Sequence, residues 1–169
     1  MIEVKKVDVK SIPVIRELAN VTWAAAYASI ISANQMKYML ELFYSAGSLQ
    51  KQIEQENHQF ILSMENATPV GFASYAPKTG CYNELVKVYR LHKIYIDPAR
   101  QGKGIGKYML DFIINDIRPA GATDLELNVN RYNKALQFYQ KSGFTITREE
   151  DIDIGNGYFM NDYVMNLSI

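Results

Sequence analysis

The stretch "HKIYIDPARQGKGIGKYML" (residues 92–110) decides the fold of this chain. Three glycines (Gly102, Gly104 and Gly106) fall within five positions, between an alternating apolar run and a run with helical periodicity. Glycine destabilises regular structure but suits a backbone that must adopt left-handed angles or lie close to a ligand. The stretch therefore predicts a strand, a glycine-rich turn and a helix.

The turn has the physical properties of an anion site. Unpaired N–H groups and the positive end of the helix dipole attract anions, and Arg100, Lys103 and Lys107 add positive charge. A P-loop is excluded, because Gln101 stands where its first glycine belongs and Tyr108 where its Ser or Thr belongs. The dinucleotide fingerprint is excluded too, because Lys107 or Met109 takes the place of its third glycine.

Two segments in the right order resemble the GNAT superfamily of N-acetyltransferases. "Gln101-x-x-Gly104-x-Gly106", preceded by Arg100, resembles the family's acetyl-CoA signature. About thirty residues on, "NVNRYNKALQFYQKSGF" (128–144) resembles the family's Asn-to-Gly-Phe segment, with its alanine shifted by one position. The segment "TWAAAYASIISANQMKYMLELFYSAGSLQKQIE" (22–54) shows a weaker resemblance to PaiA-type polyamine acetyltransferases.

The resemblance implies acetyl-CoA as cosubstrate and no metal. The pyrophosphate would rest on the backbone amides of the turn, and the pantetheine arm would pair with the end of the preceding strand as an added strand does. The Asn133 side chain, which follows the next strand, would bind the pantetheine. The residues assigned to acetyl-CoA in this way are Ile94, Tyr95, Ile96, Arg100, Gln101, Gly102, Lys103, Gly104, Ile105, Gly106, Lys107, Asn133 and Lys141.

The resemblance also implies direct attack of an amine on the thioester, without a covalent intermediate. Tyr139 would protonate the departing thiolate, the alternative being an aromatic packed beside Phe138. His92 stands where several polyamine-acetylating relatives carry a glutamate, and would take the amine's proton. It would lie on the same strand face as Ile94 and titrate between about 6 and 8. The alternative is that His92 only lines the sheet. In that case Glu84 or water would take the proton.

The acceptor would be a primary amine of a small molecule, polyamine or peptide, bound between the first two helices and the sheet. Aromatic side chains that could shape its site are Trp23, Tyr27 and Tyr38, and acidic side chains that could hold a polyamine are Glu41, Glu84 and Asp162. We expect His58 at the surface. The alternative function is a non-catalytic acyl-CoA-binding sensor with the same fold.

Composition narrows the remaining classes. The 169 residues suit a single domain, 1–169, with 48% hydrophobic and 21% charged residues. Lys plus Arg equals Asp plus Glu at 18 each, which argues against nucleic acid or an anionic membrane as partner. The lone Cys81 predicts a loop thiol in a reducing compartment, and the charged, alternating first residues do not resemble a signal peptide. We therefore expect a cytoplasmic protein; a homodimer is an expectation from the family.

Periodicity predicts the order strand, helices, three strands, helix, strand, helix, two strands. The fold class is α/β, with a GNAT-like mixed, mostly antiparallel sheet of about seven strands and helices on both faces. We expect Ser11 to cap the first helix. The expected strands are 2–7, 60–64, 70–76, 85–96, 125–129, 144–150 and 158–169. The expected helices start at 11 and near 36, and span 46–56, 105–117 and 133–143.

Overall fold

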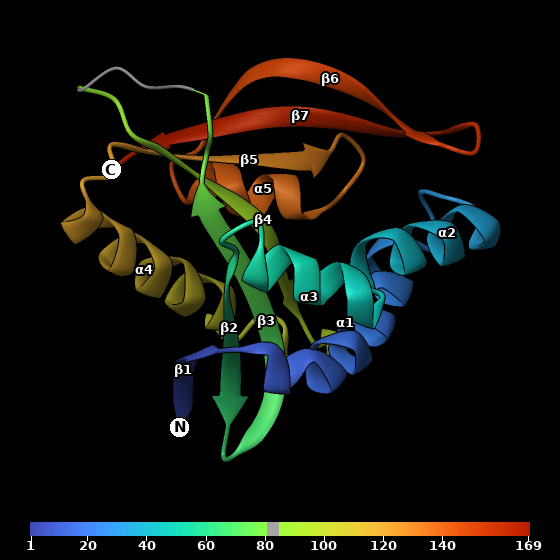
Figure 1. Ribbon diagram of the computed structural model, residues 1–169, viewed down its shortest axis with the longest axis horizontal. Helices are drawn as coiled ribbons and strands as arrows, with labels where there is room; N and C mark the ends of the chain where they lie inside the picture. Colours follow the sequence, from blue (N-terminus) through green and yellow to red (C-terminus); the bar gives the residue numbers. More distant parts are fainter. Residues whose placement is uncertain (81–84) are drawn as a thin grey trace.

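A mixed sheet forms the centre of the structure (Figure 1). In the computed structural model, which describes residues 1–80 and 85–169, the strand order is β1-β2-β3-β4-β5-β7-β6. The strands are β1 (Ile2–Val7), β2 (Gln59–Glu65), β3 (Thr68–Pro77), β4 (Val88–Ile96), β5 (Asp124–Asn130), β6 (Thr145–Gly155) and β7 (Tyr158–Ser168). The helices are α1 (Ile12–Tyr27), α2 (Ala33–Tyr44), α3 (Ala46–Glu54), α4 (Ile105–Ile117) and α5 (Ala135–Lys141).

The predicted fold class is confirmed. The β4–β5 pair is parallel, whereas the other described pairs are antiparallel. Figure 1 shows α1, α2 and α3 gathered on one side of the sheet and α4 on the other. Each side has its own buried core: Ile15 and Phe72 belong to the core under α1–α3, and Met109 and Leu125 to the core under α4 and α5. The alternation of strand side chains divides the apolar residues between these two cores.

Several expected boundaries need correction. Ser11 occupies the N-cap position of α1, but its side chain makes no capping hydrogen bond. Instead, Asp8 accepts from the backbone N–H of Lys10 and caps the short 3-10 turn that precedes α1. α3 ends at Glu54 rather than 56, β4 starts at Val88 rather than 85, and β6 continues to Gly155. Cys81 and Glu84, for which we predicted a loop thiol and an alternative base, lie outside the described residues.

Two irregularities of β4 determine the shape of the central sheet. Its register against β3 shifts between Leu91 and Lys93, which leaves His92 as the additional residue of a β-bulge. Its parallel pairing with β5 ends at Leu91, opposite Leu127. Within the described residues, the backbone of β4 beyond Leu91 therefore has a strand partner on the β3 side alone. This is an open sheet edge inside the molecule.

The β6–β7 hairpin reaches across to α2 (Figure 1). The Tyr38 hydroxyl donates to the Ile154 carbonyl at 2.6 Å, and its ring lies 5.3 Å from that of Tyr158. In the described part of the chain, no helix is both long and apolar enough to cross a membrane.

Candidate active site

The glycine turn has the geometry that an anion site needs. Gly102 and Gly104 adopt left-handed φ angles of +79° and +78°, and a Cβ at either would meet nothing within 4 Å. The first backbone hydrogen bond of α4 runs from the Tyr108 N–H to the Gly104 carbonyl. The amides of Ile105, Gly106 and Lys107 therefore have no acceptor among the described residues. They form an open cradle of N–H donors at a helix N-terminus.

The third glycine of the turn serves packing rather than ligand approach. A Cβ on Gly106 would lie 3.1 Å from the Cδ1 of Ile96 and 3.2 Å from the Cζ of Phe138. Gly106 therefore lets the first turn of α4 lie directly against β4 and α5.

The positive charge of the turn is smaller than its sequence predicts. Arg100 and Lys103 both pair with Glu65 at the end of β2. Lys107 pairs with Asp111 one helical turn later, at 2.6 Å. Because these two carboxylates offset most of the charge of the three cations, the backbone amides are the main anion-binding feature of the turn.

A cavity of about 620 Å³ runs from this turn along the open edge of β4. Its lining brings many of the predicted site residues together, and also includes Thr22, Lys93, Asn128, Tyr132 and Lys134, which we had not predicted. The predicted residues that line it are Tyr27, His92, Ile94, Tyr95, Ile96, Arg100, Gln101, Gly102, Gly104, Ile105, Gly106, Lys107, Asn133 and Tyr139. Lys103 and the exposed Lys141 are not part of the lining.

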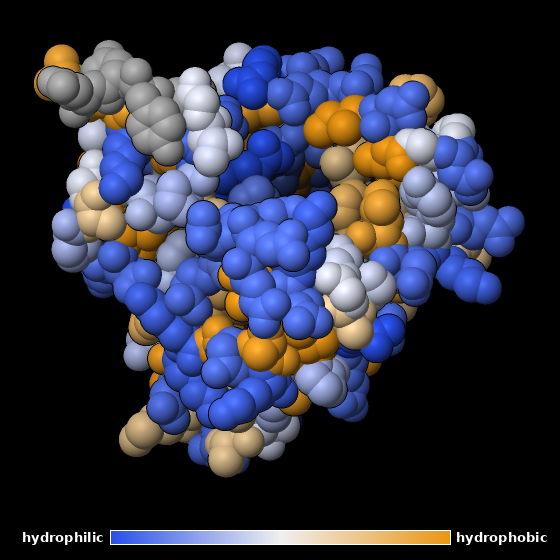
Figure 2. Space-filling model, in the orientation of Figure 1, coloured by the Kyte–Doolittle hydropathy of each residue, from blue (hydrophilic) through white to orange (hydrophobic). Residues whose placement is uncertain are grey.

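A second hollow, of about 720 Å³, lies between α1 and α2. It contains Glu41 but none of the residues that we predicted for acetyl-CoA or catalysis. We therefore place the site in the cavity beside β4. In the space-filling view, a hollow with a mostly hydrophilic rim opens between the β6–β7 hairpin and α3 (Figure 2).

Tyr139 and Asn133 meet in this cavity although their spacing does not suit one helix face. Asn133 precedes α5 and its Oδ1 accepts from the backbone N–H of Ala135, so it is a residue of the loop rather than of the helix. Tyr139 is buried, with ring centroids 5.4 Å from Phe138 and 5.7 Å from Phe144. Burial, and to a lesser extent the nearby Tyr27, raises the pKa of Tyr139. Its phenol therefore stays protonated and able to donate at neutral pH.

The predicted aromatic residues of the acceptor site have different positions. Tyr27 lines the cavity, and its hydroxyl lies 3.0 Å from that of Tyr95. Trp23 is buried against it, donates its indole N–H to the Tyr44 hydroxyl and does not line the cavity. Tyr38 holds the β6–β7 hairpin to α2 and does not line the cavity. Trp23 and Tyr38 therefore serve packing between elements, a role that is common for aromatic residues.

The bulge changes two predictions about His92. With one residue inserted, Leu91, Ile94 and Ile96 pack against the core under α4, while Tyr95 packs on the α1 side. His92 stacks on His58, with centroids 4.0 Å apart, and so does not share the face of Ile94 as we expected. His58 is largely buried, with a side chain 10% exposed, rather than at the surface.

The surroundings of His92 also argue against the expected titration between 6 and 8. The side chain is exposed in the cavity, but its confined position lowers the pKa of His92 far below its ordinary value, and His58, Lys93 and Arg90 lower it further. The imidazole is therefore neutral throughout the physiological range and can accept a hydrogen bond.

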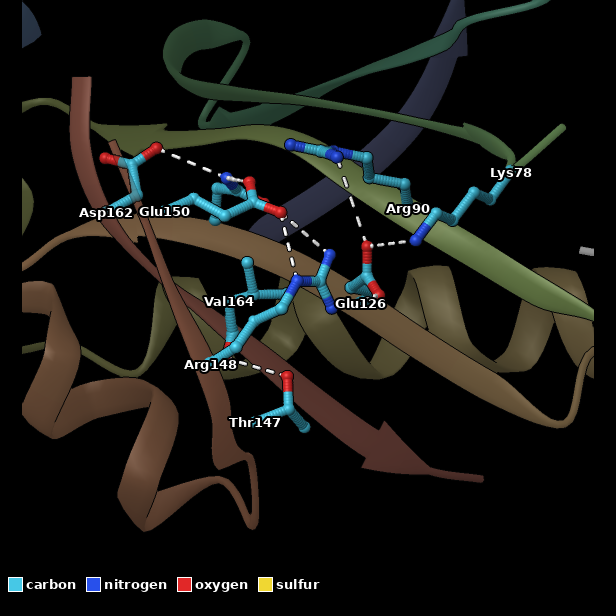
Figure 3. A network of polar contacts seen from close by, with 9 residues as sticks. Lys78, Arg90, Glu126, Thr147, Arg148, Glu150, Asp162 and Val164 are labelled. Carbon is cyan, nitrogen blue, oxygen red and sulfur yellow. Dashed lines mark hydrogen bonds and ion pairs between the residues drawn. The ribbon is translucent and has the colours of Figure 1, made fainter. Parts of the chain in front are cut away.

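A chain of polar contacts continues from the cavity across the face of the sheet (Figure 3). Lys78 contacts Glu126 at 2.8 Å, and Arg148 binds one oxygen of Glu150 at 2.8 and 3.0 Å. Asn128 lines the cavity and donates to both Glu150 and Asp162. Asp162 is 6% exposed and has no cation within 4.0 Å among the described residues. Burial raises the pKa of Asp162.

The residues present fit acetyl-CoA. The open amide cradle suits a pyrophosphate, and the unpaired edge of β4 suits the amides of a pantetheine arm. Both features lie along one cavity. The fold and this site together define an N-acetyltransferase that uses acetyl-CoA.

Comparison with known proteins gives the family. A family model described as Acetyltransferase (GNAT) domain matches residues 27–166, and the chain belongs to the GNAT family of acetyltransferases. It is 25% identical over 164 residues to the spermidine N(1)-acetyltransferase of Thermoplasma acidophilum, covering 94% of this chain and 95% of that protein. It is 28% identical over 92 residues to an L-amino acid N-acyltransferase of Escherichia coli, covering 53% of this chain and 51% of that protein.

Solved structures agree with this assignment. The PaiA N-acetyltransferase of Thermoplasma acidophilum, solved in complex with coenzyme A, superposes with a TM-score of 0.81 at 25% identity, covering 100% of this chain and 99% of that one. A GCN5-related N-acetyltransferase of Rhodopseudomonas palustris has a TM-score of 0.80 at 16% identity, covering 99% and 95%, and so shares the fold.

Proposed function

We propose that the protein transfers the acetyl group of acetyl-CoA directly to a primary amine of a small molecule, with polyamines as the first class to test. The observation that carries this proposal is the single cavity that joins the amide cradle of α4 to Tyr139, Asn133 and His92. When bound, acetyl-CoA supplies a thioester whose carbonyl carbon accepts the amine. Direct transfer then requires a neutral amine, a polarised carbonyl and a proton for the thiolate.

The chain offers a group for each requirement. The neutral imidazole of His92 accepts a hydrogen bond from the amine and orients it. The open edge of β4 near Ile94 offers backbone N–H to the carbonyl oxygen. As the nitrogen–carbon bond forms and the carbon–sulfur bond breaks, Tyr139 donates its phenol proton to the thiolate, because its raised pKa keeps the hydroxyl protonated until then. The proton that the nitrogen loses passes to solvent water, which returns a proton to the Tyr139 oxygen.

The polyamine proposal rests on Asp162 and on the spermidine acetyltransferase of Thermoplasma. Asp162 accepts a hydrogen bond from Asn128, which lines the cavity. In the described part of the chain no cation lies within 4.0 Å of its carboxylate, and Arg90 and Arg131 act on it only from a longer distance. A second ammonium group, some distance from the reacting amine, would supply a close cation partner. A carboxylate beside a hydrogen-bonding amide is a suitable acceptor for it.

An amine panel tests the function. The rate of free-CoA release is measured with spermidine, spermine, simple monoamines, amino acids and a short peptide. We expect release with one or more amines and the highest kcat/KM with polyamines. Binding of acetyl-CoA without release for any amine would contradict the proposal and favour the acyl-CoA-binding sensor.

Asp162→Asn tests the polyamine part. The substitution keeps the shape and removes the charge, so the KM for spermidine should rise about tenfold. The KM for a monoamine of similar length should stay the same, because that substrate has no second ammonium. An equal rise for both substrates would exclude Asp162 as the partner of a second ammonium.

A further inference from the structure

Two imidazole rings meet at the point where β4 leaves β5. His92 is the bulge residue of β4, and His58 belongs to the segment between α3 and β2. Their ring planes differ by 21° and their centroids are 4.0 Å apart, which is a face-to-face stack. His92 lines the cavity, whereas His58 lies behind it and does not. A bulge frees a side chain from the sheet pattern and redirects it, so another contact must set its direction.

The end of α3 holds His58 in place. Its backbone N–H donates to the Gln52 carbonyl at 2.9 Å. The Gln52 side chain also accepts from the Lys93 ammonium at 2.6 Å and donates to the Phe43 carbonyl at 2.9 Å. The same buried glutamine therefore fixes His58 and the neighbour of His92 in the bulge. The ring that stacks on His92 and the residue that follows His92 are thus both held by the end of α3.

Burial, with the nearby cations adding to its effect, keeps both rings neutral. Arg90 and Lys93 come from β4 and Glu56 from the segment after α3. Burial lowers the pKa of His58 to about 4, Lys93 lowers it further, and the weaker effect of Glu56 opposes this. The Nε2 atom of His58 lies 3.8 Å from Glu56, and its buried Nδ1 has no hydrogen-bond partner among residues 1–80 and 85–169. Neither nitrogen of His58 therefore has the short hydrogen bonds that a proton relay would require.

We propose that His58 is a positioning residue for acetyl transfer, because its ring stacks on His92 and holds that imidazole facing the cavity. The inference rests on the proposed function, in which His92 orients the amine. The shape of the ring at position 58 carries this role, and its nitrogen atoms do not. A flat ring of similar size should therefore replace it.

Three variants test the inference, with the amine that the panel identifies. His58→Ala removes the stack, His58→Phe keeps a flat ring without nitrogen, and His92→Gln removes the oriented imidazole. We expect His58→Ala to lower kcat/KM for the amine about tenfold or more. We expect His58→Phe to stay within about threefold of the unmodified protein. Calorimetric affinity for acetyl-CoA should stay unchanged in all three, which also reports that each variant is folded.

The double variant separates positioning from general destabilisation. In a protein that already carries His92→Gln, His58→Ala should lower kcat/KM little further, because the effects of residues that act together are not additive. The proton signals of the His92 ring should move downfield in His58→Ala and stay near their original position in His58→Phe. Should His58→Ala not fold, His58→Leu takes its place, because leucine fills a similar volume without a flat ring; we expect it to lower kcat/KM as His58→Ala would, and an unchanged kcat/KM would overturn the positioning role.

Each contrary outcome has a distinct meaning. Unchanged kcat/KM in His58→Ala, a His58→Phe variant as slow as His58→Ala, or full additivity with His92→Gln would overturn the positioning role. Full turnover in His92→Gln would overturn the role of His92 in the proposed function, and this inference with it. Failure of the function itself would appear earlier, as absent CoA release in the unmodified protein.

Discussion

Tyr139 combines two roles that the sequence offered as alternatives. Its ring packs between Phe138 and Phe144 in the core under α4 and α5, and the side chain also lines the cavity. No described residue makes a hydrogen bond to the Tyr139 hydroxyl, so this group is free to donate a proton to a ligand. The packing orients the ring, and the hydroxyl remains available to a ligand.

Replacing Tyr139 by Phe should separate these two roles. The substitution keeps the packing, so affinity for acetyl-CoA and the melting temperature should change little. As the proton donor is lost, kcat should fall about 10²–10⁴-fold. Tyr163→Phe is the matched control, because it removes a hydroxyl from the same core but outside the cavity. Similar turnover in both variants would leave Tyr139 with a packing role.

The pH dependence of acetyl transfer should follow the amine and not His92. Since the pKa of His92 is lowered, its imidazole does not titrate near neutral pH. A neutral amine must attack, so kcat/KM should rise with pH through the pKa of the acceptor's own ammonium group. The pH profile of kcat/KM is measured for a strongly basic alkylamine and a weakly basic fluoroalkylamine. Limbs at one fixed pH for both amines would mean that a protein group titrates.

His58 shows what single residues of the sequence could not reveal. The stack with His92 joins residues that are 34 positions apart in the chain, and stacking has no local pattern. The position of the polar side chains of β5, in contrast, could have been predicted from the sequence. Glu126 and Asn128 alternate with the buried Leu125 and Leu127, which places them together on the opposite face, where the cavity and the polar chain lie.

At the scale of elements, the turn and the helix that follows it were predictable because their physics is local. Left-handed angles favour glycine, and the first turn of a helix leaves its N–H groups free. The bulge in β4 depends on the register with β3, which is not local. Its trace in the sequence is the spacing of Leu91, Ile94 and Ile96, where a step of three interrupts the alternation. That step explains why our prediction for the face of His92 was wrong.

Gly104→Glu should abolish acetyl-CoA binding. The added carboxylate would lie at the open amide cradle and repel a pyrophosphate. Because Gly104 has a φ of +78°, any side chain there also costs stability, about 1 kcal/mol. Gly104→Gln is the matched control, since it carries the same strain and bulk without the charge. Affinities are measured by calorimetry; equal affinity in both variants would exclude charge repulsion, and unmodified affinity in Gly104→Glu would remove the turn from the site.

At the scale of the whole molecule, the site exists because the sheet divides between β4 and β5. Strands β1–β4 contribute apolar residues to both cores, whereas those of β5 and β7 belong largely to the core under α4 and α5. Parallel pairing joins these parts over the four residues from Val88 to Leu91, after which β4 and β5 separate. The order of elements predicted this sheet. The point of separation depends on how both cores pack against β4, and no short segment encodes it.

The neutral histidine pair should make the stability of the whole protein depend on pH. The pKa of His58 is about 4 in the folded protein and close to 6.5 when the chain unfolds. Between these values the unfolded chain binds more protons, so the free energy of unfolding should fall as pH drops from about 6.5 to about 4. His58 contributes at most about 3 kcal/mol to this loss. Denaturant unfolding at several pH values measures it, with His58→Phe as the comparison. That variant keeps the ring but cannot be protonated, so its unfolding free energy should fall less over this interval. The carboxylates that do not contact residue 58 titrate alike in both proteins and cancel in the difference. Parallel curves for the two proteins would mean that His58 is protonated as easily in the folded protein as in the unfolded chain.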